Sequence, residues 1–170
     1  LNSFFVRGVL EIQPAIVGQL LAGDSASLAI VTAAAGIGSL MASGWIGLGY
    51  LNKSQIQDLL LPMVFAGIVI TAALHFFVNI VPISVIFVVT GFTATLVGIG
   101  AQTLIQLEVN ENYRARVMTW WSTISFGSLV FGGSIIGFLG DIIGISNAII
   151  IMMLGGTAVA LTLLICRRNA

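Results

Sequence analysis

Long runs of hydrophobic residues, separated by short polar segments, divide the chain into six stretches of helix length. Each stretch holds about 20 residues, which at a rise of about 1.5 Å per residue matches the ~30 Å hydrocarbon core of a bilayer. The runs are too continuous for the alternating pattern of membrane β-strands, so they predict transmembrane helices. The predicted spans are residues 3–21, 27–50, 58–78, 83–107, 117–139 and 145–166.

This pattern predicts an all-α membrane protein in which residues 1–170 form a single transmembrane domain. The basic residues define its orientation, because five of the six fall in the second loop, the fourth loop and the C-terminal tail. Those three places share one side of a six-pass layout, and short loops rich in lysine and arginine stay cytoplasmic. We therefore expect both termini in the cytoplasm. The five basic residues are Lys53, Arg114, Arg116, Arg167 and Arg168.

Composition argues against a soluble domain, a nucleic-acid-binding protein and an enzyme. The chain is 58% hydrophobic and 7% charged, whereas a soluble domain carries about 25% charged residues. A net charge of zero and the lack of a basic tract argue against nucleic-acid binding. With one cysteine and one histidine, and without hydrolase, metalloprotease or nucleotide-binding motifs, we expect no enzyme activity, no metal and no cofactor.

Two charged residues lie inside the first predicted span. Arg7 and Glu11 stand four residues apart and so share a helix face. A charged group at the bilayer centre costs about 2.5–3.5 kcal/mol, so each side chain should face the bundle or a wet cavity. One interpretation is a substrate contact or a proton-coupling carboxylate. The other is a structural ion pair near the cytoplasmic end, with Arg7 extending outward to the interface.

The fourth predicted span carries a polar stripe. Its residues recur every three or four positions and fall within one narrow arc of a helix. Thr95 and Gln102 in this stripe are candidates for lining a substrate cavity. The alternative is close helix packing, with the amides hydrogen-bonded to a neighbouring helix. The stripe consists of Gly91, Thr95, Gly98, Gln102 and Gln106.

Small residues in the fifth predicted span indicate close helix contacts. Gly133 and Gly137 form a GxxxG motif, which lets helix backbones approach one another and is common in membrane helices.

The chain also starts at Leu1 without a methionine or a signal-peptide pattern, which suggests a piece of a longer protein.

Several segments resemble bacterial major facilitator superfamily transporters. The segment from Asn112 to Met118 (NYRARVM) resembles the R-G-R-V-M-S element between helices ten and eleven, with Ala115 in place of the glycine. The segment from Gly133 to Gly144 (GSIIGFLGDIIG) resembles the G-x-x-x-D-x-x-G element that follows. The segment AGIG at 35–38 resembles the G-x-G stretch of helix eight. The order of elements agrees over essentially the whole chain, and the subgroup it resembles is that of the enterobactin-exporter-like transmembrane secretion effectors.

The resemblance implies one six-helix half of a twelve-helix transporter, built from 3+3 inverted repeats with substrate held near the midplane between halves. The implied partners are the lipid bilayer, an N-terminal six-helix half, a small-molecule substrate and protons. The implied activity is proton-coupled export of small organic molecules, and the implied location is a bacterial inner membrane. Gly133, Gly137 and Asp141, together with Arg114 and Arg116, become candidates for helix packing or gating.

Two other functions fit the same composition. The chain is alternatively the membrane module of a lipid-handling or acyltransferase-fused protein, in which case the full gene encodes a catalytic domain. Or it is a scaffold that does not transport, in which case Arg7, Glu11 and Gln102 tolerate apolar replacement.

Overall fold

The computed structural model describes residues 1–21, 23–49 and 52–169, and within these ranges the only regular elements are helices. Tyr50, the predicted end of the second span, lies outside them. The elements are η1 (Asn2–Val6), α1 (Arg7–Glu11), α2 (Gln13–Leu20), α3 (Ser25–Gly47), α4 (Lys53–Ala72), η2 (Ala73–Phe76), α5 (Ile80–Glu108), α6 (Glu111–Ile143) and α7 (Ile145–Asn169).

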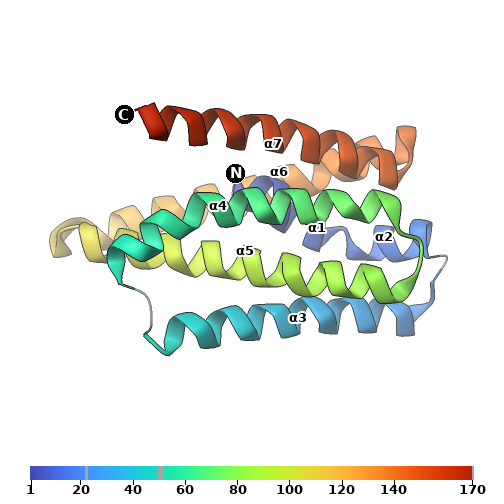
Figure 1. The fold of residues 1–170 in the computed structure, drawn as a ribbon, viewed down its shortest axis with the longest axis horizontal. Coiled ribbons are helices and arrows are strands. Elements are labelled where there is room, and N and C mark those ends of the chain that lie inside the picture. The colour runs from blue at the N-terminus through green and yellow to red at the C-terminus, as the bar shows by residue number, and fades with distance from the viewer. Residues whose placement is uncertain (22, 50–51, 170) are drawn as a thin grey trace.

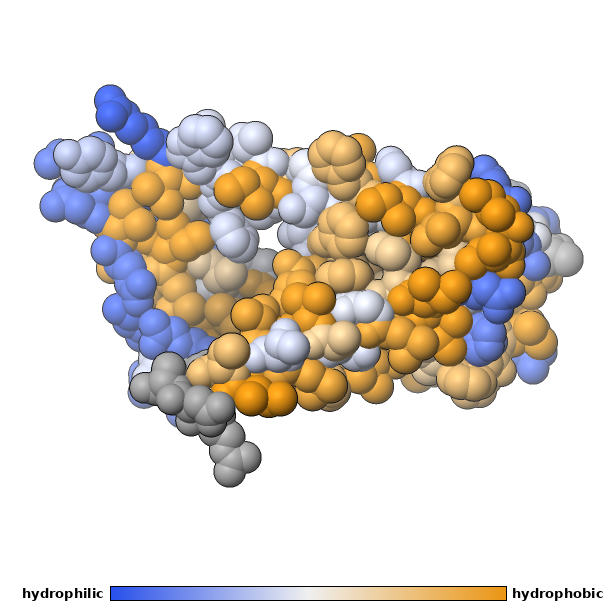
Figure 2. Space-filling view, turned by 90° about the horizontal axis from the view of Figure 1, so that it is seen from above, coloured by the Kyte–Doolittle hydropathy of each residue, from blue (hydrophilic) through white to orange (hydrophobic). Residues whose placement is uncertain are grey.

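Five of the helices are long and apolar enough to cross a membrane: α3, α4 with η2, α5, α6 and α7. Their outward faces are apolar too, since Leu40, Val81 and Phe131 are 74%, 70% and 68% exposed. Figure 2 shows hydrophilic residues gathered at the two ends of the molecule and hydrophobic ones between them. A surface of this kind is unfavourable in water and favourable in lipid. The fold is therefore that of a multi-pass, all-helical membrane protein.

The helices extend beyond the predicted apolar spans because polar residues cap their ends. Helix α4 begins at Lys53 rather than residue 58, where the backbone N–H of Asn52 donates to Gln55 Oε1 at 2.8 Å. Helix α6 begins at Glu111 rather than residue 117, with the Asn110 side chain accepting from the Asn112 N–H. Such caps satisfy the free N–H groups of a first helical turn. The polar stretch expected to form the fourth loop is thus mostly helix.

The expected turn at Gly140–Asp141 also lies inside a helix. Helix α6 continues to Ile143, and the chain reverses at Gly144, whose φ of +85° suits a residue without a side chain. Asp24 behaves as expected of a turn residue, since its carboxylate accepts from the Ser27 N–H and caps α3.

The first segment, residues 2–20, is not one continuous helix. It consists of a π-helical turn, five residues of α1 and eight of α2, with the break at Ile12. Pro14 in the first turn of α2 explains the break, because proline lacks an N–H and its ring clashes with the preceding turn. The predicted span 3–21 therefore corresponds to a broken segment, which is not among the five candidate membrane spans.

Helix α5 lies between α3 and α4 and packs against both, whereas α7 packs against α4 and α6 (Figure 1). Helices α3 and α5 run parallel and approach through glycines. A Cβ at Gly38 would overlap the carbonyl of Val88, and a Cβ at Gly91 would overlap that of Ala35. This contact explains the small residues of the second predicted span, which the two helices need for backbone contact.

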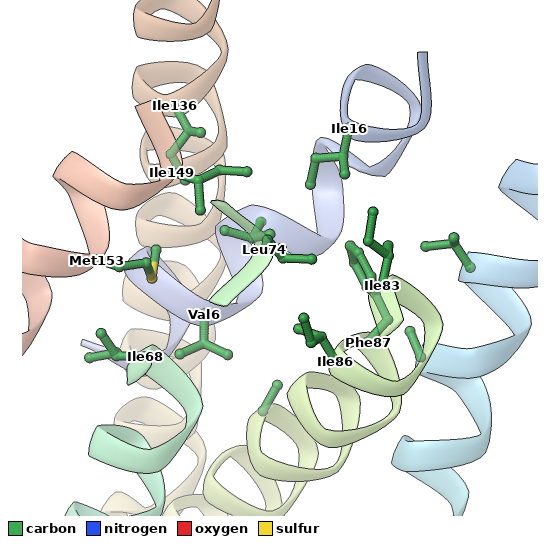
Figure 3. Close-up of a cluster of buried hydrophobic side chains, with 14 of the residues drawn as sticks. Val6, Ile16, Ile68, Leu74, Ile83, Ile86, Phe87, Ile136, Ile149 and Met153 are labelled. Atoms are coloured by element: carbon green, nitrogen blue, oxygen red, sulfur yellow. The ribbon is translucent and has the colours of Figure 1, made fainter. Parts of the chain in front are cut away.

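A buried cluster joins the first segment to the other helices. Figure 3 shows Val6 of the first segment between Ile68 of α4 and side chains of α7, while Phe87 of α5 lies on the other side of the cluster. All three side chains are fully buried. The first segment is therefore packed into the bundle in spite of its break.

The basic loops lie at one end of the bundle, as the sequence predicts. The Lys53 ammonium is 3.1 Å from the Glu108 carboxylate, so the second loop and the end of α5 meet. The C-terminal end of α7 lies at the same end (Figure 1). The chain's N-terminus differs, because Asn2 Nδ2 donates to the carbonyl of Ala94 at 3.0 Å, near the middle of α5.

Candidate functional site

A hollow of about 550 Å³ opens at mid-length in the bundle, within the ~300–1,000 Å³ range of small-molecule sites. The first segment, α4, α5 and α6 form its walls. We refer to it as the central cavity. Its polar side chains are Asn2, Ser3, Arg7, Gln102, Ser122, Ser125 and Ser128, and its larger apolar ones include Leu60, Leu61, Val64, Val97, Ile124 and Phe126.

Arg7 and Gln102, both predicted from the sequence, meet at this cavity. Of the two interpretations of Arg7, its position in the cavity wall favours a ligand contact over a side chain that extends outward to the interface. Asn2 lies at mid-length in the bundle, so the segment places Arg7 far from the bundle end that carries the basic loops. Its side chain is partly buried, and no hydrogen bond or ion pair of its guanidinium occurs within the described ranges.

Glu11 lines a different hollow, together with Gly133 and Ser134. This hollow measures about 350 Å³, and the Glu11 side chain is exposed there. The expected structural ion pair with Arg7 does not form in the described part of the chain. Glu11 instead faces whatever covers this side of α1 and α6.

Three serines of α6 complete the central cavity, and they were not predicted. Ser122, Ser125 and Ser128 recur every third residue, and each lines the cavity. Their three-residue spacing was the available signal, since residues three apart share a helix side. They add hydroxyls that donate and accept hydrogen bonds.

Asn2 forms part of the cavity wall and was also missed. Its side chain is 9% exposed, with Nδ2 bonded to Ala94 and Oδ1 buried without a partner in the described part of the chain. An unsatisfied buried acceptor costs about 1–3 kcal/mol. No periodicity of the sequence predicts this contact, because it depends on where the first segment meets α5.

The polar stripe of α5 divides between two roles. Gly98 and Gln102 line the central cavity, whereas Gly91 and Thr95 face α3. Thr95 Oγ1 donates to Ser39 Oγ at 2.9 Å, and a Cβ at Gly91 would strike Ala35. Thr95 therefore belongs to helix packing and does not line the cavity.

Helix α6 approaches the first segment closely through Gly132 and Gly133, whereas the sequence predicts Gly133 and Gly137 as the contact pair. A Cβ at Gly132 would overlap the Phe4 carbonyl, and one at Gly8 would lie 3.0 Å from the Gly133 nitrogen. Gly137 has no neighbouring atom within 4 Å of the place its Cβ would occupy. The GxxxG contact is thus replaced by Gly132 and Gly133 packing on the first segment.

The remaining candidates lie on the surface. Asp141 is exposed in the last turn of α6, and Arg114 and Arg116 are exposed in its first turns. Their side chains have no ion pair among the side chains that the structure describes, those of residues 1–21, 23–49 and 52–166. In the same ranges no three residues of the types His, Cys, Asp and Glu come together as a metal site.

Comparison with protein-family profiles, with curated proteins and with solved structures gives no match.

Proposed function

We propose that this chain is the C-terminal six-helix half of a secondary active transporter of the major facilitator type. The observation that carries the proposal is the central cavity, a hollow of ligand size with convergent polar side chains at mid-length in an apolar helical bundle. Transporters of this architecture hold substrate near the bilayer midplane. Motifs resembling that superfamily along the chain support the same interpretation.

In this proposal the broken first segment, which begins at mid-length in the bundle, takes the place of the sixth span. Transporters commonly build their binding sites from discontinuous helices near mid-depth. Here Arg7 precedes the break at Ile12 and lines the cavity, and Glu11 ends the helical piece before the break. Both charged side chains of the segment therefore lie within one and a half helical turns of the break, as expected of a functional site.

Proton coupling is assigned to Glu11. It is the one carboxylate within the first segment, and its side chain lies beside Gly133, ten residues before the end of α6. Ten residues correspond to about 15 Å of helix, so the carboxylate lies well inside the apolar zone. Intramembrane acids of this kind mark proton and ion pathways. Export of a small organic molecule would then be driven by the proton gradient.

An N-terminal six-helix half is the proposed partner. Glu11 and Ser134 face outward on the α1–α6 side, where direct contact with lipid is unfavourable. A second helical half would cover this face and close the cavity. The end of the bundle with the basic loops would face the cytoplasm.

The proposal is tested in everted membrane vesicles that contain the protein encoded by the uninterrupted reading frame. Energised vesicles should take up members of a panel of fluorescent organic compounds above the level of empty-vector vesicles, and a protonophore should abolish that uptake. Vesicles with only the 170-residue chain should remain at background. Uptake by the 170-residue chain as a monomer, or uptake that survives the protonophore, would contradict the proposal.

A further inference from the structure

The central cavity contains a positive charge without a counter-ion among the residues that the structure describes. Of its described lining residues, Arg7 is the one with a charged side chain, and none is an aspartate or glutamate. The nearest acid along the chain, Glu11, lines the other hollow. A guanidinium stays ionised under all biological conditions and presents five N–H donors. Removing such a charge from water without a partner is unfavourable, so an arrangement of this kind favours an anionic ligand.

We infer that the central cavity binds amphipathic organic anions, in which a carboxylate or a similar oxyanion meets Arg7 and an apolar body lies between α4, α5 and α6. This inference rests on the proposed function and names its substrate class. Carboxylates match the fork of an arginine with two parallel hydrogen bonds, which a lysine does not reproduce.

The apolar side chains and the volume of the central cavity favour a ligand with an apolar body. Leu60 and Val64 of α4, Val97 of α5 and Ile124 and Phe126 of α6 all contribute to the lining. A volume of about 550 Å³ exceeds what an inorganic anion would fill. A bare phosphate or chloride would leave these apolar walls without contacts.

The neutral polar groups limit the rest of the ligand. Gln102 and the serines at 122, 125 and 128 offer amide and hydroxyl groups that both donate and accept. They suit an additional hydroxyl, ether or amide on the ligand. These groups of the present chain would not compensate a second full charge, so on this side of the cavity a ligand with one negative charge fits better than a dianion or a zwitterion.

Three isosteric probes test the inference: 2-naphthoate, 2-naphthamide and 2-naphthamidine, which are anionic, neutral and cationic near neutral pH. Binding is measured by equilibrium dialysis against the protein in lipid nanodiscs, with empty nanodiscs as the control for partition into lipid. We expect naphthoate to bind about 10- to 100-fold more tightly than naphthamide, as a charge-assisted hydrogen bond provides. Naphthamidine should bind more weakly than naphthamide.

Substitutions identify the group responsible. Arg7→Gln should remove the preference for naphthoate, Arg7→Lys should retain part of it, and Arg116→Gln, which changes an exposed arginine outside the cavity, should leave it intact. Gln102→Leu should weaken binding of all three probes without changing their order. Helical circular dichroism and gel filtration verify that each variant folds.

The outcomes separate this inference from the proposed function. Equal affinity for the three probes, a preference for the cation, no binding of naphthoate, or a naphthoate preference that persists in Arg7→Gln would each overturn the inference. Anion binding that depends on Arg7, in a protein without proton-driven uptake, would support the inference and contradict the transport proposal. Proton-driven uptake with equal affinity for the three probes would support the transport proposal and contradict the inference.

Discussion

Arg7 and Glu11 stand one helical turn apart, yet their side chains line separate hollows. Arg7 belongs to the wall of the central cavity, and Glu11 lies beside Gly133 on the α1–α6 face. The irregular helix that precedes Arg7 and the break that follows Glu11 set this short piece apart from its neighbours. The two charges are therefore assigned separate tasks, ligand binding for Arg7 and proton exchange for Glu11, and are tested separately.

Glu11→Gln in the full protein should leave folding intact and impair gradient-driven export. Glutamine keeps the size and polarity of the side chain but cannot exchange a proton. The measurement is export rate as a function of the imposed pH gradient. Glu111→Gln, which changes an exposed acid in the first turn of α6, is the matched control. If Glu11→Gln retains the proton dependence of the native protein, the carboxylate has only a structural role.

Topology is checked by labelling single cysteines in a background where Cys166, which is exposed, is replaced by serine. A membrane-impermeant thiol reagent added outside intact cells should label cysteines introduced at Asp24 and Asp141. It should not label cysteines at Lys53 or Arg116, because these residues belong to the cytoplasmic end in our assignment. The reverse labelling pattern would invert the orientation and remove the basis for the family resemblance.

Glycines at the α3–α5 contact should be intolerant of a methyl group. Gly38→Ala places a Cβ against the Val88 carbonyl, whereas Gly36→Ala on the same helix meets nothing within 4 Å. Overpacking of this kind costs about 1–3 kcal/mol. Thermal unfolding in detergent should show a lower Tm for Gly38→Ala and a native-like one for Gly36→Ala. Equal Tm values for the two variants would mean that α3 and α5 do not pack in this register.

Asp24 should give the protein an acid-sensitive helix cap. The Ser27 N–H and then the Ser27 hydroxyl donate to its carboxylate and hold the pKa of Asp24 below its ordinary value. A lowered folded-state pKa means that the cap's contribution is complete above the unfolded pKa. It is lost as pH falls through the folded value, that is below about pH 4.

The measurement for this cap is the Tm difference between the native protein and Asp24→Asn. Asparagine caps helices about as well as aspartate but does not titrate in this range. The difference should therefore change as pH falls below about 4, with the native protein losing stability relative to the variant. A difference that stays constant through this range would show that the Asp24 carboxylate is not titrating against the cap.

Hydropathy predicted where the helices lie but not where they end. Apolar runs mark the part of a helix that contacts lipid, and the caps at Asn52 and Asn110 lie in polar sequence beyond it. This explains why α4 and α6 begin five and six residues before the predicted spans (53 against 58, 111 against 117). Pro14 was visible as a helix breaker, but the exact position of the break depended on packing.

Prediction of the cavity was limited by a different effect. Periodicity grouped Thr95 and Gln102 on one helix face, and both do lie on α5. Which helix each one faces depends on the neighbours, since α3 covers Thr95 and leaves Gln102 to the cavity. Arg7 was identified by its cost in lipid, but its depth required the contact of Asn2 with Ala94.

The parallel contact of α3 and α5 has a consequence for biogenesis. These two helices are separated in the chain by α4, so the glycine faces of α3 have no partner when α3 first enters the bilayer. Gly38 packs against Val88, which follows 50 residues later (88 − 38), and at about 5–20 residues per second this separation is a delay of about 2.5–10 s during synthesis. Throughout that delay the exposed glycine face is open to other nascent helices and to membrane chaperones. Slower translation after residue 47 would lengthen this exposure and lower the yield of inserted protein without altering a single side chain.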